Sequence, residues 1–489
     1  MTSTPTSSPD ANASQAHPSH EGRPTPMHSI DPTTGETFAT YDTLTPEQIE
    51  DRLQRAQTAF GTYRLTTFAQ RAEWMARAGE LLHERKHELA ALATREMGKT
   101  LAAALAEVEK CAKSCQYYAQ NAEKFLADEH VTTEAERAYV TYQPLGVVLA
   151  VMPWNFPYWQ VFRFIGPAIM AGNVGLLKHA SNVPGCALAI ESVMQQAGFP
   201  QDVFQTLLVG SRSIEAILKD DRVKAVSLTG SEGAGRSVAG TAGAAIKPSV
   251  MELGGSDPFI VMPSADLDLA VKTAVTARTI NNGQSCIAAK RFIVHEAIYD
   301  RFVNGFVDGL AALTLGDPMQ DTTDIGPLAT PAIRDEVHGL VQDAVQKGAT
   351  VLLGGQIPQG QGNYYPATAL SDLTPDMQVY GEEVFGPVAL IFRVPDQQEA
   401  IRVANATRFG LGSSAWTNDD AERARFARDL EAGSVFINSM VASDPRLPFG
   451  GVKASGFGRE LSRHGIHEFV NTKTVSIGAA PDAHKSKTE

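Results

Sequence analysis

Cysteine is scarce in this sequence, and it has no basic cluster and no long apolar run. Four cysteines in 489 residues are too few for a disulfide framework, which favours a reducing cytoplasm. A formal net charge of -13 without a basic block makes nucleic acid and anionic membranes poor partners. No apolar segment approaches the length needed to cross a bilayer. We therefore expect a cytoplasmic, soluble globular protein.

Two patterns that could bind ligands are better explained by the protein core. Cys111 and Cys115 lie one helical turn apart with no histidine cluster beside them, which favours two buried thiols over a metal site. Residues 97–100 resemble the end of a phosphate-binding loop, but Ala93 stands where that motif needs glycine. We expect a local break in a helix at residues 97–100. We also expect that the protein binds no metal.

The order of sequence patterns along the chain predicts an α/β fold. Residues 1–26 are rich in Ser, Thr and Pro, which predicts a disordered tail. Residues 45–127 have a helical pattern that opens with a capping box. From 146 to 262 short apolar strands alternate with helices, which indicates a doubly wound parallel sheet. A second α/β stretch follows from about 266 to 440.

Four short motifs carry groups that could do chemistry, although each has a plainer explanation. Cys286 follows a polar, glycine-containing loop, yet a lone cysteine is more often inert core. Glu252 precedes paired glycines and could be a general base or a surface residue. Asn155 follows the first parallel strand and could stabilise an oxyanion or form a turn. The turn at 229–235 could cradle a pyrophosphate, but it lacks the G-x-G-x-x-G spacing.

Taken together and in this order, the motifs resemble those of the aldehyde dehydrogenase superfamily. The resemblance extends from about residue 30 to 477. Within the superfamily, the sequence is similar to the bacterial NADP-type succinate-semialdehyde dehydrogenase branch. Further matching stretches are 172–173, 177–178, 382–387, 448–453 and 455–460. The resemblance implies a doubly wound cofactor domain, a catalytic α/β domain and a small strand extension for oligomerisation. The implied ranges are 27–128 and 145–253 for the dinucleotide-binding domain, 254–455 for the catalytic domain, and 129–144 and 456–480 for oligomerisation and bridging.

The resemblance also implies the chemistry. Cys286 would attack the aldehyde as a thiolate, and Asn155 with the Cys286 main-chain N–H would hold the oxyanion. After hydride transfer, Glu252 would activate the water that hydrolyses the thioester. Glu460 would be a second carboxylate in proton relay, with a plain surface glutamate as the alternative. Members of the family form dimers or tetramers, so we expect a homodimer or homotetramer acting on a small-molecule aldehyde.

The cofactor contacts follow from the same resemblance. Lys178 would bind the adenosine ribose, the turn would approach the pyrophosphate, Glu383 would bind the nicotinamide ribose and Phe385 would pack by the ring. The expected set is Met152, Pro153, Trp154, Lys178, Ser181, Gly230, Ser231, Gly235, Glu383 and Phe385.

The position three after Lys178 bears on the choice between NADP and NAD. Members that favour NAD often have glutamate there, which repels a 2′-phosphate, whereas this chain has Ser181. The serine hydroxyl can bond to phosphate, and His179 can add positive charge, so NADP is preferred and NAD stays open. Ser181 could instead cap the helix that begins near Pro184.

Arg163 bears on the substrate, because succinate-semialdehyde dehydrogenases have an arginine at that distance after the oxyanion asparagine. A guanidinium fork suits the distal carboxylate, although an ordinary salt bridge is the alternative. Members of that branch can have a second arginine six residues before the cysteine, where this chain has Ile280. Arg278 or Arg446 could substitute, and Ser443 lies in the same loop as Arg446. Broader aliphatic or other semialdehyde specificity remains the alternative.

Three other functions are disfavoured by particular residues. A CoA-acylating enzyme of the same fold has no need of the water-activating Glu252. A cysteine hydrolase needs an oriented histidine base, which His179 and His295 do not offer in sequence. A non-catalytic protein on this scaffold is expected to lose the nucleophile or the base, and this chain has both.

Overall fold

The structure, a computed structural model, describes residues 25–479, so the tail expected at 1–26 lies almost wholly outside the described residues, as does residue 480. A hairpin of β1 (Met27–Ile30) and β2 (Thr37–Tyr41) comes first. The helical region then divides into α1 (Pro46–Tyr63), α2 (Phe68–Glu84), α3 (Lys86–Met97) and α4 (Leu101–Phe125). Thr45 and Gln48 form the predicted capping box at α1.

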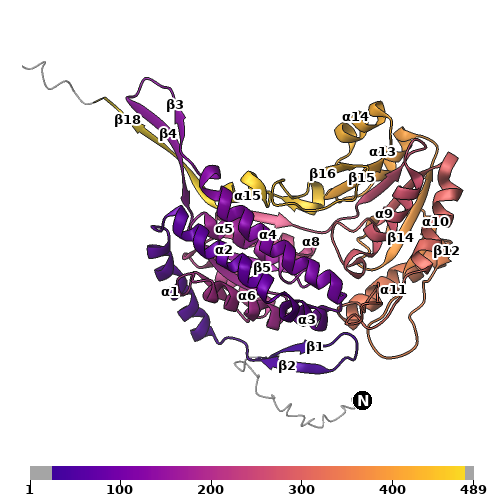
Figure 1. Cartoon of the computed structure of the whole chain (residues 1–489), viewed down its shortest axis with the longest axis horizontal. Helices are drawn as coiled ribbons and strands as arrows, with labels where there is room; N and C mark the ends of the chain where they lie inside the picture. The colour runs from indigo at the N-terminus through magenta and orange to yellow at the C-terminus, as the bar shows by residue number, and fades with distance from the viewer. Residues whose placement is uncertain (1–24, 480–489) are drawn as a thin grey trace, which may run out of the picture.

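The first parallel sheet has the strand order β17-β9-β8-β5-β6-β7, and all its pairs are parallel except β17 with β9. Its strands are β5 (Val147–Met152), β6 (Val174–His179), β7 (Phe204–Thr206), β8 (Val223–Thr229), β9 (Ser249–Glu252) and β17 (Gly456–Phe457). The accompanying helices are α5 (Trp159–Met170), α6 (Pro184–Gln196), η1 (Ser211–Ser213), α7 (Ile214–Lys219) and α8 (Glu232–Ala244). The long helices α2 and α4 lie across one face of this sheet in Figure 1. The predicted doubly wound α/β fold is confirmed.

The second sheet has the order β12-β13-β14-β11-β10-β15-β16 and is parallel except for β12 with β13. Its strands are β10 (Pro258–Val261), β11 (Arg291–His295), β12 (Thr350–Leu353), β13 (Thr368–Ser371), β14 (Val388–Val394), β15 (Gly412–Trp416) and β16 (Ser434–Ile437). Its helices are α9 (Leu267–Thr279), η2 (Ile280–Gly283), η3 (Glu296–Ile298), α10 (Tyr299–Ala311), α11 (Pro331–Gln346), α12 (Gln378–Gly381), α13 (Gln397–Asn405) and α14 (Asp420–Asp429). This sheet and its helices form the lobe on the right of Figure 1.

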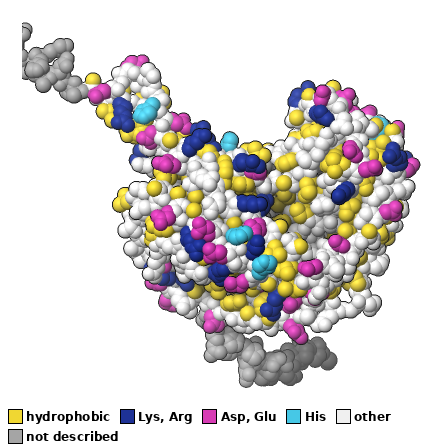
Figure 2. Space-filling view, viewed as in Figure 1, with side chains coloured by type: hydrophobic (Ala, Val, Ile, Leu, Met, Phe, Trp, Pro, Cys, Tyr) yellow, Lys and Arg dark blue, Asp and Glu magenta, His cyan; other side chains and the backbone are white. Residues whose placement is uncertain are grey.

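A third, antiparallel sheet extends from the body as an arm. It consists of β3 (Glu129–Val131), β4 (Arg137–Pro144) and β18 (Val470–Ile477), so the two segments expected to support oligomerisation pair with each other. The chain reaches β18 through η4 (Lys453–Ser455) and α15 (Ser462–His467). The surface is hollowed between this arm and the lobe that ends in α14 (Figure 2).

Both patterns attributed to the core are explained by packing. Cys111 and Cys115 are free thiols buried inside α4. Gly98 ends α3 with a left-handed φ of 82°, and a Cβ there would lie 2.4 Å from the Pro327 carbonyl oxygen, so the glycine is needed for a tight turn. None of the helices between residues 25 and 479 is long and apolar enough to cross a membrane.

Candidate active site

Three neighbouring strands of the first parallel sheet bring the predicted groups to one edge. β5 pairs with β8 and β8 pairs with β9, so their carboxyl ends lie side by side. Asn155 follows β5, the glycine-rich turn follows β8, and Glu252 is the last residue of β9. Thr229 stands directly opposite Glu252 in the register. Parallel α/β sheets bind ligands at this edge.

The loop before the thiol is shaped by a run of left-handed residues. Asn281, Asn282 and Gly283 have φ values of 57°, 58° and 75°. Asparagine tolerates this conformation better than most residues, and a Cβ at Gly283 would lie 2.4 Å from the Gly386 carbonyl carbon. The Asn281 amide nitrogen donates to the Asn155 and Gln284 carbonyl oxygens at 2.8 and 2.9 Å. The sequence N-N-G-Q-S-C therefore folds into one fixed turn beside Asn155.

The main chain at Cys286 is held by a lysine that sequence reasoning missed. Lys290, wholly buried, donates from Nζ to the Ser285 and Cys286 carbonyl oxygens at 2.8 and 2.6 Å. Its charge is balanced by Glu383, whose Oε1 lies 3.2 Å from Nζ. Lys290 stands four residues after the cysteine, and that spacing alone does not identify an anchor for the loop.

The side chain of Asn155 is buried and points to the same turn. Its Nδ2 donates to the Gln284 carbonyl oxygen at 3.2 Å, whereas its Oδ1 has no partner among the described residues. An amide nitrogen has two N–H donors, so one remains for a developing oxyanion. Cys286 and Asn155 line one cavity of about 380 Å³.

The cavity also brings together the groups expected to bind a dinucleotide. It is lined by Pro153, Trp154, Asn155, Gly230, Ser231, Cys286, Glu383 and Phe385, among others. Ser231 caps α8 by accepting from the Ala234 N–H at 3.4 Å. A Cβ at Gly235 would lie 2.5 Å from Leu253, so glycine allows α8 to approach β9 closely. Phe385 and Trp154 stand edge to face with ring centroids 5.7 Å apart. A helix N-terminus, a close glycine turn and an aromatic wall together fit a dinucleotide.

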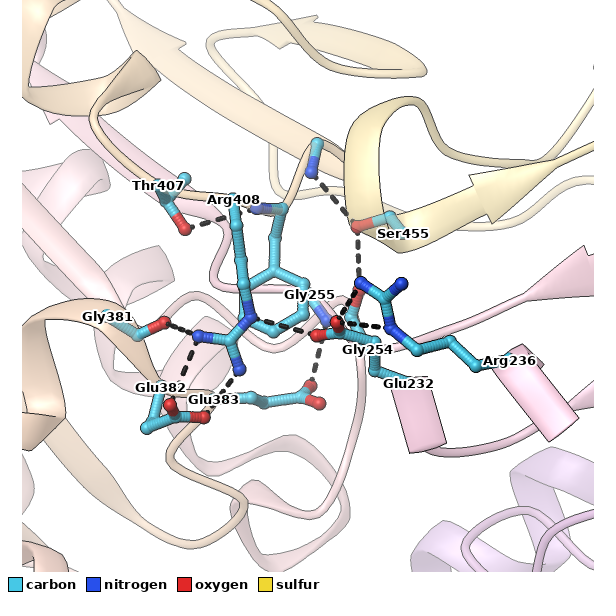
Figure 3. A network of polar contacts seen from close by, with 12 residues as sticks. Glu232, Arg236, Gly254, Gly255, Gly381, Glu382, Glu383, Thr407, Arg408 and Ser455 are labelled. Atoms are coloured by element: carbon cyan, nitrogen blue, oxygen red, sulfur yellow. Dashed lines mark hydrogen bonds and ion pairs between the residues drawn. The ribbon is translucent and has the colours of Figure 1, made fainter. Parts of the chain in front are cut away.

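The mouth of the cavity contains an ion network that the sequence did not reveal (Figure 3). Arg408 bonds to Glu232 at 2.9 Å and to Glu382 at 2.5 Å, joining the start of α8 to the segment before β14. Arg236, one turn along α8, also pairs with Glu232. These residues come from three distant parts of the chain, so no local spacing predicts their contact.

The residues near the expected ribose site answer two questions left open by the sequence. Ser181 is exposed, and α6 is capped by Val183 without a side-chain hydrogen bond, so Ser181 does not cap that helix. The prediction that His179 adds a positive charge is wrong. His179 is buried with Nε2 2.9 Å from the Pro157 carbonyl oxygen, and burial lowers its pKa to about 4. Burial also lowers the pKa of the half-buried Lys178.

Glu252 lies in a buried cluster with a second carboxylate and an arginine. Glu252 and Glu460 are each 2% exposed, so a plain surface glutamate is excluded for both. Both oxygens of Glu252 lack hydrogen-bond partners among the described residues. Burial, and then the charge of Glu460, hold the pKa of Glu252 well above its usual range, which Arg163 opposes. A carboxylate with a raised pKa is suited to accept a proton near neutral pH.

Arg163 is fixed by this cluster. Its Nε forms a buried ion pair with Glu460, and Nη2 donates to Thr229 at 3.1 Å. Its guanidinium carbon lies 4.6 Å from the centroid of the Phe449 ring. Burial raises the pKa of Cys286 to about 12, and Arg163 is the foremost charge that lowers it. Arg163 thus acts electrostatically on both the thiol and the carboxylates.

The other predicted substrate residues differ in their surroundings. Arg278, one of the two alternatives for a second substrate cation, is wholly buried and donates from both Nη atoms to the Val388 and Gly283 carbonyl oxygens, which argues against that role. Arg446 is exposed and makes a two-pronged ion pair with Asp444. Its contact with a substrate stays a prediction. Ser443 accepts a hydrogen bond from Lys110 on α4, at 2.6 Å.

Comparison with known proteins agrees with this geometry. Residues 19–475 match the model of the aldehyde dehydrogenase family. The chain is 59% identical over 459 residues to succinate-semialdehyde dehydrogenase [NADP(+)] of Mycobacterium avium (strain 104), covering 93% of this chain and 97% of that one. It is 58% identical to succinate-semialdehyde dehydrogenase [NADP(+)] 1 of Mycobacterium tuberculosis (strain ATCC 25618 / H37Rv), over 92% of this chain and 100% of that one. The solved succinic semialdehyde dehydrogenase of Streptococcus pyogenes, in complex with NADP+, superposes with a TM-score of 0.91 at 36% identity, covering 93% of this chain and 100% of that one. The match to the family model and to these relatives shows that the chain belongs to the aldehyde dehydrogenase family.

Proposed function

We propose that the protein oxidises succinate semialdehyde to succinate with NADP as the hydride acceptor. One observation carries the proposal: Asn155 and Cys286 line one cleft, and Glu252, which ends β9 at the same edge of the first parallel sheet, directly precedes Leu253 and Gly254 of that lining. The relatives named for this substrate and this cofactor support the finer assignment. The catalytic steps follow from the side chains in place.

Cys286, as a thiolate, attacks the aldehyde carbon with its sulfur, forming a tetrahedral thiohemiacetal whose oxygen carries the negative charge. The resulting oxyanion accepts hydrogen bonds from the free N–H of the Asn155 amide and from the Cys286 main chain. Lys290 keeps the loop in place through two carbonyl oxygens, so the donors are aligned before reaction. NADP, when bound, supplies the acceptor for the hydride whose departure converts the adduct into a thioester.

Glu252 completes the reaction by taking a proton from the water that attacks the thioester. Its raised pKa makes it a better base than an exposed glutamate. Glu460 accepts a hydrogen bond from Ser227 at 3.2 Å, and its charge acts on Glu252. This second buried carboxylate serves as the proton relay. The product acid then leaves Cys286 free.

The residues for NADP are assigned by their place around the cleft. Met152, Pro153 and Trp154 lead from β5 into it, Gly230, Ser231 and Gly235 form the turn for the pyrophosphate, and Glu383 and Phe385 close the nicotinamide end. Lys178 and the exposed Ser181 hold the adenosine ribose and its 2′-phosphate. Residues 27–128 and 145–253 form the cofactor domain, and residues 254–455 form the catalytic domain.

Arg163 is the proposed anchor for the distal carboxylate of the substrate. Its Nε and Nη2 are engaged by Glu460 and Thr229, which fixes the guanidinium and leaves Nη1 to the substrate. A guanidinium held in this way loses little entropy on binding. Ser443 contributes a hydroxyl from the facing loop.

The assembly and location are part of the proposal. The arm of β3, β4 and β18 supports a homodimer or homotetramer, because its outer strands leave edges for a partner. The four free thiols, three of them buried, fit a reducing cytoplasm. Light scattering on the purified protein tests the assembly, and a monomeric mass would contradict it.

An initial-rate panel tests the proposed substrate and cofactor. Succinate semialdehyde, glutarate semialdehyde and butanal are each assayed with NADP and with NAD. We expect the highest kcat/KM for succinate semialdehyde with NADP. Butanal turned over as efficiently as succinate semialdehyde would contradict carboxylate recognition, and a preference for NAD would contradict the role of Ser181.

A further inference from the structure

A second cation lies beside the proposed carboxylate site, on helix α4, for which the sequence patterns predicted no chemical role. Lys110 of α4 donates from Nζ to Ser443 Oγ at 2.6 Å. The same Nζ lies 4.2 Å from the centroid of the Trp159 ring on α5. Trp159 and Arg163 are four residues apart in that helix and so share a face. Lys110 and Arg163 therefore approach the same side of α5, next to the loop that contains Ser443.

The ammonium of Lys110 has no anionic partner of its own. Lys110 is half-buried, and within residues 25–479 no carboxylate lies at ion-pair distance from its Nζ. The nearby carboxylates are engaged elsewhere, since Glu107 pairs with Lys99 and Asp444 pairs with Arg446. Ammonium has three N–H donors, of which a neutral hydroxyl takes one. A sheltered cation without a counter-ion is costly and favours an anion that enters from outside.

We propose that Lys110 is a specificity-determining residue that binds the distal carboxylate of the semialdehyde together with Arg163 and Ser443. The inference rests on the proposed function and deepens it, since it names a second cation of the substrate site. Ile280 stands where related enzymes can have their second arginine, and Lys110 supplies that charge from α4. Arg163 links the two ends of the site, because its charge acts on both Lys110 and the Cys286 thiol.

The charge on this lysine depends on pH within the working range of an enzyme. Burial, followed by the charge of Arg163, lowers the pKa of Lys110 to about 8. Cys111 and Glu107 on its own helix and Asp444 on the facing loop oppose the shift. The ammonium is charged below this pH and neutral above it, so preference for a charged aldehyde falls as pH rises through about 8. The protonated lysine is the form that binds carboxylate.

The measured quantity is the ratio of kcat/KM for succinate semialdehyde to that for butanal, at saturating NADP. Both aldehydes have four carbons and share the thiol chemistry, so the ratio isolates the carboxylate. Lys110→Met should lower the ratio by about 10- to 100-fold, the range expected for a lost charge-assisted hydrogen bond. Lys110→Arg should restore most of it. Lys113→Met, an exposed lysine on the same helix, is the matched control and should leave the ratio unchanged.

The wild-type enzyme provides a test that requires no variant. Its selectivity ratio should fall between pH 7 and pH 9.5, whereas the ratio for Lys110→Arg should stay nearly level, because arginine stays protonated. A wild-type enzyme with no preference for succinate semialdehyde would overturn the proposed function itself. A preference that survives in Lys110→Met, or a wild-type ratio independent of pH, would overturn only the role of Lys110.

Discussion

Replacement of Asn155 by alanine should separate catalysis from stability. The structure gives its Nδ2 one fixed acceptor, the Gln284 carbonyl oxygen at 3.2 Å, and leaves the second N–H for the oxyanion. Loss of one preorganised donor costs about 2.7–4 kcal/mol of transition-state stabilisation, or about 100- to 1,000-fold in kcat. The Gln284 carbonyl oxygen keeps a second donor in Asn281, at 2.9 Å, so no buried acceptor is left unpaired. The loss of folding free energy should therefore be about 1 kcal/mol.

The assay is NADPH formation at saturating succinate semialdehyde, with Tm measured in parallel. We expect kcat of Asn155→Ala to fall by about 100- to 1,000-fold, KM for NADP to change little, and Tm to fall by less than about 4 °C. Asn304→Ala, an exposed asparagine on α10, is the control for loss of an amide. A decrease in kcat of less than tenfold would refute the oxyanion role. A large loss of Tm would show that Asn155 chiefly holds the fold.

Four other substitutions test separate parts of the site. Arg163→Ala should raise KM for succinate semialdehyde far more than for butanal. It should also lower Tm, because the buried Glu460 loses its partner. Adding Glu460→Gln should recover Tm but not KM. Ser181→Glu should raise KM for NADP at least about tenfold with little effect on NAD, since a carboxylate repels the 2′-phosphate; equal effects on both cofactors would contradict this placement. Lys290→Met should lower kcat by about tenfold or more without changing the aldehyde preference, because the loop loses two hydrogen bonds. The raised pKa of Glu252 means that the fold loses stability as pH rises from the ordinary carboxyl pKa of 4.5 through the raised one, so Glu252→Gln should flatten the decline of Tm over that range; a parallel decline in both proteins would count against it.

The sequence predicted those features that local patterns determine. The alternation of apolar strands and helices gave the parallel sheet, and Thr45 with Gln48 marked the start of α1 because a capping box is complete within four residues. The order of the motifs grouped Asn155, Glu252 and Cys286 in one site through their resemblance to the aldehyde dehydrogenase superfamily. Each motif is short and local, so this grouping did not require tertiary contacts.

Contacts between distant segments could not be predicted in the same way. Arg163 pairs with Glu460, and Lys110 with Ser443, across hundreds of residues, so sequence spacing carries no signal for either. His179 was expected to be charged because it follows Lys178, but β6 directs its side chain into the core, where desolvation keeps it neutral. Burial decides the charge of such groups, and burial depends on the whole fold.

The central claim is that the acyl group of the substrate is carried on Cys286 and released by water that Glu252 activates. Mass spectrometry of Glu252→Gln, quenched after mixing with succinate semialdehyde and NADP, tests it most directly. We expect one equivalent of NADPH, then a stall, and a succinyl thioester on the peptide that contains Cys286. Steady turnover by this variant, or an adduct on Cys111, Cys115 or Cys186 instead, would contradict the claim.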